Sequence, residues 1–190
     1  MEHLLESIKL LSKNNIENKR VLVRVDFNVP LTQDLQIADG VRIVKSLPTI
    51  QLLLKNNNKV ILVSHLGRPK GRDATSSLKP VANYLIKALP QNNIILVDDF
   101  LSENGKKQLS KQAAKDIIVL ENIRYYEGEQ KNDEAFTKQL ASIADAYVND
   151  AFGVAHRNDA SVIGIPGILP SYCGLLLEQE IRAVATIMDN

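Results

Sequence analysis

Short apolar runs alternate along the chain with longer segments in which apolar residues recur at helical spacing. The runs are rich in valine and isoleucine and lie at residues 21–25, 60–64, 94–97, 117–120 and 146–149. Each is almost continuously apolar, which is typical of a parallel strand covered by helices on both faces. The alternation predicts βαβ units and therefore an α/β fold, a doubly wound, Rossmann-like and mostly parallel sheet with helices on both faces.

The segments between the runs carry the expected helices. The first has an apolar stripe at helical spacing, formed by Val44, Leu47, Ile50 and Leu54. Pro48 would lie near its start or at a kink. The next has Ser77 as its candidate cap and Pro80 in its first turn, and two more begin near Ser102 and after Asn132. A last helix starts near residue 174, so we divide the chain into an α/β domain over residues 1–173 and a helix over 174–190.

Composition narrows the class of protein. The 190 residues include 23 Lys and Arg against 22 Asp and Glu, a formal net charge of +1, which gives no general attraction to nucleic acid or to an anionic membrane. The single cysteine, Cys173, cannot form an internal disulfide, no Cys/His cluster has zinc spacing, and no apolar run is long enough to span a membrane. We therefore expect a soluble, cytoplasmic protein that binds neither nucleic acid nor membrane.

Basic residues gather where the predicted strands end. Of the eight arginines, four lie at strand ends and a fifth at the start of the first crossover, namely Arg24, Arg68, Arg124, Arg157 and Arg42. Two of the three histidines, His65 and His156, join them. Ligands of open α/β sheets bind beyond the carboxyl ends of the strands, and the planar fork of arginine matches carboxylate and phosphate. The gathering predicts a site for a small, multiply anionic ligand.

The sequence lacks the common motifs for nucleotides and for hydrolysis. It contains no G-x-x-x-x-G-K-[ST] loop, and no G-x-G-x-x-G follows the first strand. It also contains no G-x-S-x-G elbow. We therefore expect no cofactor-binding residue and no metal ligand in this chain.

Four segments at the strand ends carry a more specific signal. They are Arg24-Val-Asp-Phe-Asn-Val-Pro30, Ser64-His-Leu-Gly-Arg-Pro-Lys-Gly71, Glu121-Asn-Ile-Arg124 leading to Glu129-Gln-Lys-Asn-Asp133, and Asp150-Ala-Phe-Gly-Val-Ala-His-Arg157. In order and spacing they closely resemble the N-terminal half of the phosphoglycerate kinase family, and the resemblance covers the whole chain. Members of that family continue past a helix similar to residues 177–181 into a second, nucleotide-binding domain with glycine-rich loops, which the resemblance implies is absent here.

The resemblance implies an activity and a role for each matching residue. The family reversibly moves a phosphoryl group between 1,3-bisphosphoglycerate and ADP in glycolysis, giving 3-phosphoglycerate and MgATP. By this resemblance Asp26 and Asn28 hold the hydroxyl and carboxylate region of 3-phosphoglycerate, and Arg42 is catalytic and also contacts the substrate. The residues implied to hold the substrate phosphate are His65, Arg68, Arg124 and Arg157.

The resemblance also sets expectations for what the chain lacks. Mg-ATP or ADP would bind the missing C-terminal domain, so the isolated chain is expected to be inactive, and the full-length enzyme is expected to be a monomer. Two features depart from the family pattern: Asp159 stands where a second histidine is common, and the Ser171-Tyr-Cys173 segment is unusual. Loss of that histidine would leave fewer basic residues in the gathering at the strand ends.

Several residues have simpler interpretations. Arg24 lies inside a strand, where a buried ion pair with Asp26 or Asp150 is about as reasonable as ligand contact, so it is left out of the site. Asp26 and Asn28 could instead cap a turn, and His156 could orient Arg157. The alternative function is a stand-alone module that binds a phosphorylated metabolite. Nucleic-acid binding is disfavoured because the arginines form no basic helix or stripe.

Overall fold

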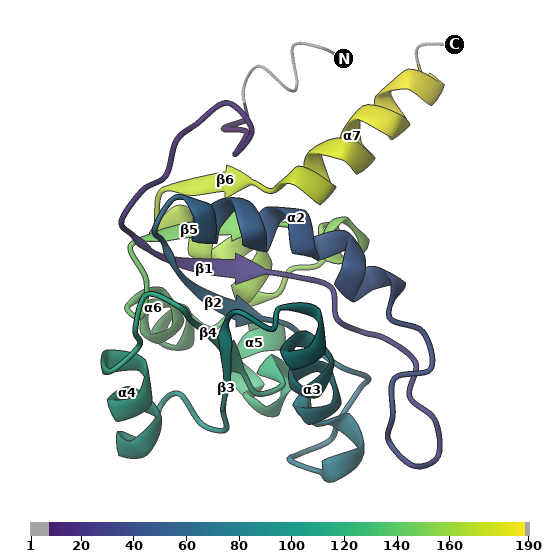
Figure 1. Cartoon of the computed structure of the whole chain (residues 1–190), viewed down its shortest axis with the longest axis vertical. Coiled ribbons are helices and arrows are strands. Elements are labelled where there is room, and N and C mark those ends of the chain that lie inside the picture. Colours follow the sequence, from purple (N-terminus) through teal and green to yellow (C-terminus); the bar gives the residue numbers. More distant parts are fainter. Residues whose placement is uncertain (1–7, 189–190) are drawn as a thin grey trace.

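A six-stranded parallel sheet organises the chain, and the computed structural model describes residues 8–188 of it (Figure 1). The strands are β1 (Arg20–Arg24), β2 (Lys59–Val63), β3 (Asn93–Val97), β4 (Asp116–Leu120), β5 (Ala146–Asn149) and β6 (Ser171–Cys173). They lie in the order β3-β4-β2-β1-β5-β6, and every pairing is parallel. The doubly wound α/β fold is confirmed, and each of the five expected strands lies within one residue of its observed bounds.

Helices connect the strands. They are α2 (Val41–Lys55), α3 (Lys79–Ala88), α4 (Glu103–Ser110), α5 (Glu127–Lys131), α6 (Glu134–Ala141) and α7 (Leu175–Met188). Short 3-10 turns form η1 (Ala74–Ser76), η2 (Ile123–Tyr125), η3 (Phe152–Val154) and η5 (Ile165–Gly167), and η4 (Ala160–Gly164) is a π-helical turn. The five expected helices are confirmed, while α5 was not foreseen because its five residues are too short to show a period.

Side-chain caps explain where α4 and α6 begin. Ser102 accepts a hydrogen bond from the amide of Gly105 at 3.0 Å, which starts α4, and Asp133 caps α6 in the same way. The N-cap position of α3 is Leu78, one residue later than expected, although the Ser77 hydroxyl accepts from the amide of Lys79 at 3.1 Å and donates to Glu121 at 2.6 Å.

Alternate residues of the strands face opposite sides of the sheet, so two apolar cores form. One lies against α2 and α3 and includes Val21, Val23, Val60, Leu62, Ile43, Ile50, Leu53, Val81 and Leu85. The other lies against α4 and α6 and includes Leu22, Ile61, Ile118, Tyr147, Leu109, Phe136 and Leu140. Figure 1 shows α2 and α3 on one face and α4, α5 and α6 on the other. This double cover holds the sheet rigidly and leaves its carboxyl edge to the loops.

Strand β6 was missed by the sequence analysis. It has only three residues, pairs with β5 at the sheet edge, and also bridges to Leu10 through Cys173. Directly after it, α7 begins where the amide of Leu175 donates to the Thr49 hydroxyl of α2 at 3.0 Å. The last helix is therefore attached to the first face of the sheet at its N-terminal end.

Candidate functional site

The loops that follow four adjacent strands meet at one edge of the sheet. Strands β4, β2, β1 and β5 are neighbours and parallel, so their carboxyl ends lie side by side. The expected site residues all follow these ends: Asp26 and Asn28 after β1, Arg42 in the first turn of α2, His65 and Arg68 after β2, Arg124 in η2 after β4, and Arg157 after β5. The arrangement places one charged cluster on one edge.

Asp26, Asn28 and Arg42 form one side of this cluster. Arg42 makes an ion pair with Asp26 at 2.5 Å, and its side chain is 54% exposed. The amide of Asn28 donates to Asp26 at 3.3 Å, so the turn expected here exists. The side-chain oxygen of Asn28 accepts from the amide of Gly67 at 2.8 Å, which joins the β1 loop to the β2 loop. A side chain at Gly153 would collide with Asp26, whose carboxylate would lie 2.8 Å from the added Cβ.

Two arginines in the cluster have buried donors without partners. Arg124 is buried and donates to the carbonyl of Gly67 at 2.7 Å, yet its Nε and one terminal nitrogen have no hydrogen-bond partner. The Nε of Arg157 is also buried and unpartnered. Burial and the nearby positive charge of Arg157 lower the pKa of Arg124. Buried charged donors are ordinarily satisfied, so these atoms indicate a site for an anion.

His65 is a buried, uncharged member of the cluster. Its ring is almost completely buried, and burial together with the charges of four arginines lowers its pKa to about 2. Those arginines are Arg24, Arg124, Arg157 and Arg42. His65 is therefore neutral at physiological pH, and its contribution to an anion site is a hydrogen bond and not a charge.

Arg24 is buried and bonded within the protein, but the predicted ion pair with Asp26 or Asp150 was wrong. It is fully buried and makes no ion pair with Asp26 or Asp150 among residues 8–188. It donates instead to Ser161, to the carbonyl of Val25 and to His65. No local pattern could indicate these partners, because Ser161 lies 137 residues further along the chain.

Glu129, Ser161 and Asp159 form a buried polar group that the sequence analysis did not identify. Glu129 accepts from the Ser161 hydroxyl and from its amide, the latter at 2.9 Å, and burial raises the pKa of Glu129. Asp159 is buried, and one of its carboxylate oxygens has no partner. Its charge acts on both Arg124 and Glu129. The signal for Glu129 was its presence in the segment after Arg124, but the sequence did not assign it a role.

Arg68 and His156 lie at the outside of the cluster. Both are exposed, and neither side chain makes a hydrogen bond within residues 8–188. The expected orientation of Arg157 by His156 is therefore not seen in this structure. Gly67, directly before Arg68, has a φ of +64°, which lets the loop turn back toward Asn28.

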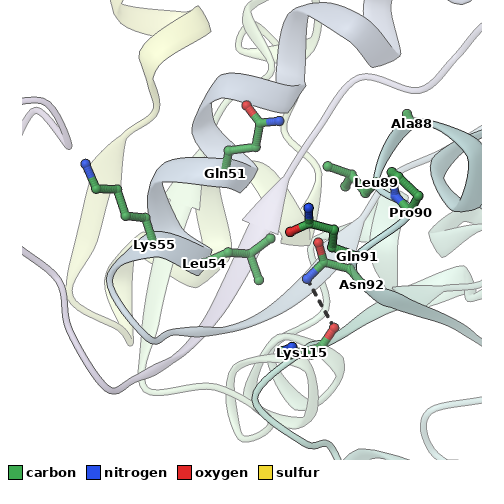
Figure 2. A pocket seen from close by; sticks show the side chains of 9 residues that line it. All are labelled: Gln51, Leu54, Lys55, Ala88, Leu89, Pro90, Gln91, Asn92 and Lys115. Atoms are coloured by element: carbon green, nitrogen blue, oxygen red, sulfur yellow. Dashed lines mark hydrogen bonds between the residues drawn. The ribbon is translucent and has the colours of Figure 1, made fainter.

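One cavity away from this edge of the sheet offers less to an anion. Figure 2 shows one of about 500 Å³ that lies between the end of α2, the residues after α3 and Lys115. Lys55 and Lys115 are both exposed there, and no buried unpartnered polar atom lines this cavity. Because the carboxyl edge of the sheet has buried unpartnered arginine donors and this cavity has none, the edge is favoured over this cavity as the functional site.

Residues 8–188 contain no group of three or more His, Cys, Asp or Glu placed to hold a metal ion. Within the same residues, no helix is both long and apolar enough to cross a membrane.

Comparison with known proteins gives a consistent result. The family model described as phosphoglycerate kinase matches residues 11–190. A phosphoglycerate kinase from Wolbachia sp. subsp. Drosophila simulans is 47% identical over 176 residues, 93% of this chain and 44% of its own length. One from Prochlorococcus marinus is 46% identical over 97% of this chain and 46% of its own length. The chain thus spans a little under half the length of these relatives.

Solved structures agree. Phosphoglycerate kinase from Coxiella burnetii superposes with a TM-score of 0.82 at 36% identity, over 94% of this chain and 44% of that one. The enzyme from Pyrococcus horikoshii superposes with a TM-score of 0.84 at 30% identity, over 94% of this chain and 45% of that one.

Proposed function

The chain belongs to the phosphoglycerate kinase family, and on that premise we propose that its residues form the half of the enzyme that binds 3-phosphoglycerate and 1,3-bisphosphoglycerate. The proposed reaction is the reversible transfer of a phosphoryl group between 1,3-bisphosphoglycerate and ADP in glycolysis. The proposed setting is a monomeric enzyme of the cytoplasm.

The observation that carries the proposal is the pair of buried, unpartnered donors on Arg124. A guanidinium with two free N–H groups matches two oxygens of one phosphate. Arg157 contributes a third buried donor, and Arg42, Asp26 and Asn28 lie at the neighbouring loop. A molecule with a phosphate at one end and a carboxylate at the other can use both parts of the edge.

We assign the substrate contacts as follows. Arg124, Arg157, Arg68 and His65 hold the phosphate that stays on the substrate. Asp26 and Asn28 hold the hydroxyl and carboxylate region. Arg42, which is half exposed and paired only with Asp26 among residues 8–188, can turn from that carboxylate to the phosphoryl group in transfer.

The chemistry that these groups support is positioning and charge stabilisation. The substrate carboxylate is itself the acceptor of the phosphoryl group when MgATP is the donor, so no covalent intermediate on the protein is needed. An oxygen held in line with the donor, with a cation beside the transferred group, lowers the barrier of a loose transition state. We place the nucleotide substrate, MgADP or MgATP, on the part of the relatives that this chain does not match.

A coupled assay for ADP tests the function. The 190-residue chain alone should form no ADP from MgATP and 3-phosphoglycerate. Joined to the part of the Wolbachia relative that it does not match, it should turn over, and Arg42→Ala should lower kcat by roughly 10³ with a much smaller effect on KM. A joined protein that is inactive while binding both substrates, or one in which Arg42→Ala changes only KM, would contradict the assignment.

A further inference from the structure

The hydrogen bonds of buried Arg24 fix the chemical state of His65. Arg24 is the last residue of β1, and all three nitrogens of its guanidinium have partners. Nε donates to the Ser161 hydroxyl at 2.9 Å, and one terminal nitrogen donates to the carbonyl of Val25 at 2.6 Å. The other terminal nitrogen lies 3.2 Å from Nδ1 of His65. None of these atoms is accessible to solvent in a residue that is 0% exposed.

The contact with Nδ1 has only one direction. A guanidinium donates hydrogen bonds and cannot accept them. Nδ1 of His65 must therefore be the acceptor and carry no hydrogen, so the ring proton of a neutral His65 lies on Nε2. An imidazolium would have a proton on both nitrogens and would lose this contact, and it would face the charges of Arg24, Arg124, Arg157 and Arg42.

The orientation of Arg24 is itself fixed. Because Nε of Arg24 is a donor, the Ser161 oxygen accepts from it, and the Ser161 hydroxyl proton goes to the buried carboxylate of Glu129. The amide of Ser161 donates to the same carboxylate at 2.9 Å. The chain of bonds from Glu129 to His65 therefore runs in one direction and leaves Nε2 as the one ring nitrogen without a partner in the described part of the chain.

We propose that Arg24 is a positioning residue that holds His65 as the neutral Nε2–H tautomer, so that the ring presents an N–H donor to the phosphate of the substrate. The identity of the ligand in this proposal rests on the proposed function above. The tautomer rests only on the contact between Arg24 and His65. It accounts for an arginine that is buried beside an anion site without touching the ligand. It also predicts that the donor strength of His65 does not change between about pH 5 and about pH 8.

Nitrogen-15 NMR of the histidine ring tests the tautomer directly in the 190-residue chain without ligand. In the unchanged chain, the cross-peaks of His65 should show a protonated Nε2 and an unprotonated Nδ1, constant between about pH 5 and about pH 8. A His65 ring protonated on Nδ1, or one that titrates in this range, overturns the proposal.

Variants then test whether Arg24 is the cause. Arg24→Lys keeps the charge but loses the planar fork, so His65 should become a mixture of tautomers and 3-phosphoglycerate should bind about tenfold more weakly. Tyr147→Phe is the matched control, because it removes a buried hydrogen bond to Ser161 in the same cluster without touching His65. It should leave the tautomer and the affinity unchanged.

A double-mutant cycle separates positioning from a general loss of structure. His65→Gln places an amide donor near Nε2 whose proton does not depend on a tautomer, so Arg24→Lys should cost little further affinity in that background. Additive losses would overturn the positioning role. If the unchanged chain has the Nε2–H tautomer but does not bind 3-phosphoglycerate, the proposed function fails; if it binds with the Nδ1–H tautomer, only the present proposal fails.

Discussion

Asp159 is a buried carboxylate that lies beside the phosphate-binding arginines proposed here. One of its oxygens has no hydrogen-bond partner, and its charge acts on Arg124. An anionic ligand would approach this same arginine, so the two negative charges would repel each other. The residue therefore weakens the anion site in a way that no count of basic residues reveals.

Replacing Asp159 by Asn should strengthen ligand binding. Removing one charge near a bound phosphate is worth about 1 kcal/mol at the dielectric of a partly buried site, so calorimetry should show roughly fivefold tighter binding of 3-phosphoglycerate. Asp34→Asn, in an exposed loop, is the control and should change nothing. Weaker binding in Asp159→Asn would mean that the carboxylate itself contacts the ligand.

At the scale of elements, the start of α7 depends on one buried carboxylate. Asp150 is fully buried and accepts from the amides of Leu176 at 2.9 Å and Leu177 at 3.3 Å. Its other oxygen has no partner. Burial raises the pKa of Asp150 from 3.8 to about 6, although a hydrogen bond from the Thr49 side chain and the two amides act against this shift. Asp150 therefore caps α7, but its buried negative charge destabilises the folded chain.

This shift has a definite sign in the free energy of unfolding. Between 3.8 and about 6 the folded chain holds a proton on Asp150 that the unfolded chain has released, so stability contributed by this group falls as pH rises through that window. Asp150→Asn keeps the acceptor oxygen without the charge. It should raise the free energy of unfolding at pH 7 by about 3 kcal/mol, the value of this pKa shift, and should not change it below the window.

Denaturant unfolding of the parent and of Asp150→Asn at several pH values gives the difference between their free energies of unfolding. Buried His65 has a lowered pKa and changes stability with pH in the opposite direction, but its effect is the same in both proteins and cancels in this difference. Asp150→Ala also removes the charge but loses both amide bonds, so it should be about 1 kcal/mol less stable than Asp150→Asn. An Asn variant that is less stable than the parent at pH 7 would show that the charge stabilises α7.

The two ends of α7 differ in how they are covered. Leu177 is buried against Leu10 and Cys173, and Ile181 packs beside them, whereas Val184 and Ile187 are exposed, Ile187 to 77%. Leu177, Ile181, Val184 and Met188 recur at helical spacing along α7. This apolar stripe is thus packed at its start only, and the side chain of Met188 lies outside the described part of the structure.

Hydrogen exchange should follow this division. Amides of residues 183–188 should exchange at least about 100-fold faster than those of β2, because few buried contacts hold the end of the helix. The measurement is repeated at low and high protein concentration, since pairing with a second molecule would slow exchange only at the higher one. Equal protection of α7 and β2 at every concentration would refute this account of the helix.

The sequence predicted those elements whose signal is local. Strands such as β2 and β4 are continuous apolar runs, and α4 has its cap at Ser102, so both were placed within a residue. Strand β6 has three residues and exists through its pairing with β5, which no periodicity can reveal. The partners of Arg24 were predicted wrongly for the same reason, because Ser161 and His65 are distant in the sequence and lie beside Arg24 only in the folded chain.

At the scale of the whole molecule, a nearly neutral chain concentrates positive charge at one edge of a rigid sheet. The net charge is +1, yet the charges of four arginines add to burial in lowering the pKa of His65. Their mutual repulsion costs free energy in the empty state, and an anion relieves it. Sulfate and phosphate should therefore raise the Tm of the chain more than chloride does at equal ionic strength, and Arg124→Ala should remove most of that difference; an equal response to all three salts would contradict the account.

Calorimetric titration of the chain with 3-phosphoglycerate and with glycerate measures whether the carboxyl edge of the sheet binds a phosphate. The two ligands differ only in the phosphate that Arg124 is proposed to hold through its two buried, unpartnered donors. We expect 3-phosphoglycerate to bind about 100-fold more tightly than glycerate, the value of two charge-assisted hydrogen bonds. Arg124→Ala should remove this preference, whereas Arg182→Ala, on a residue that pairs only with Glu178 along α7 among residues 8–188, should keep it. Equal affinity for the two ligands, or a preference that survives in Arg124→Ala, would contradict the account.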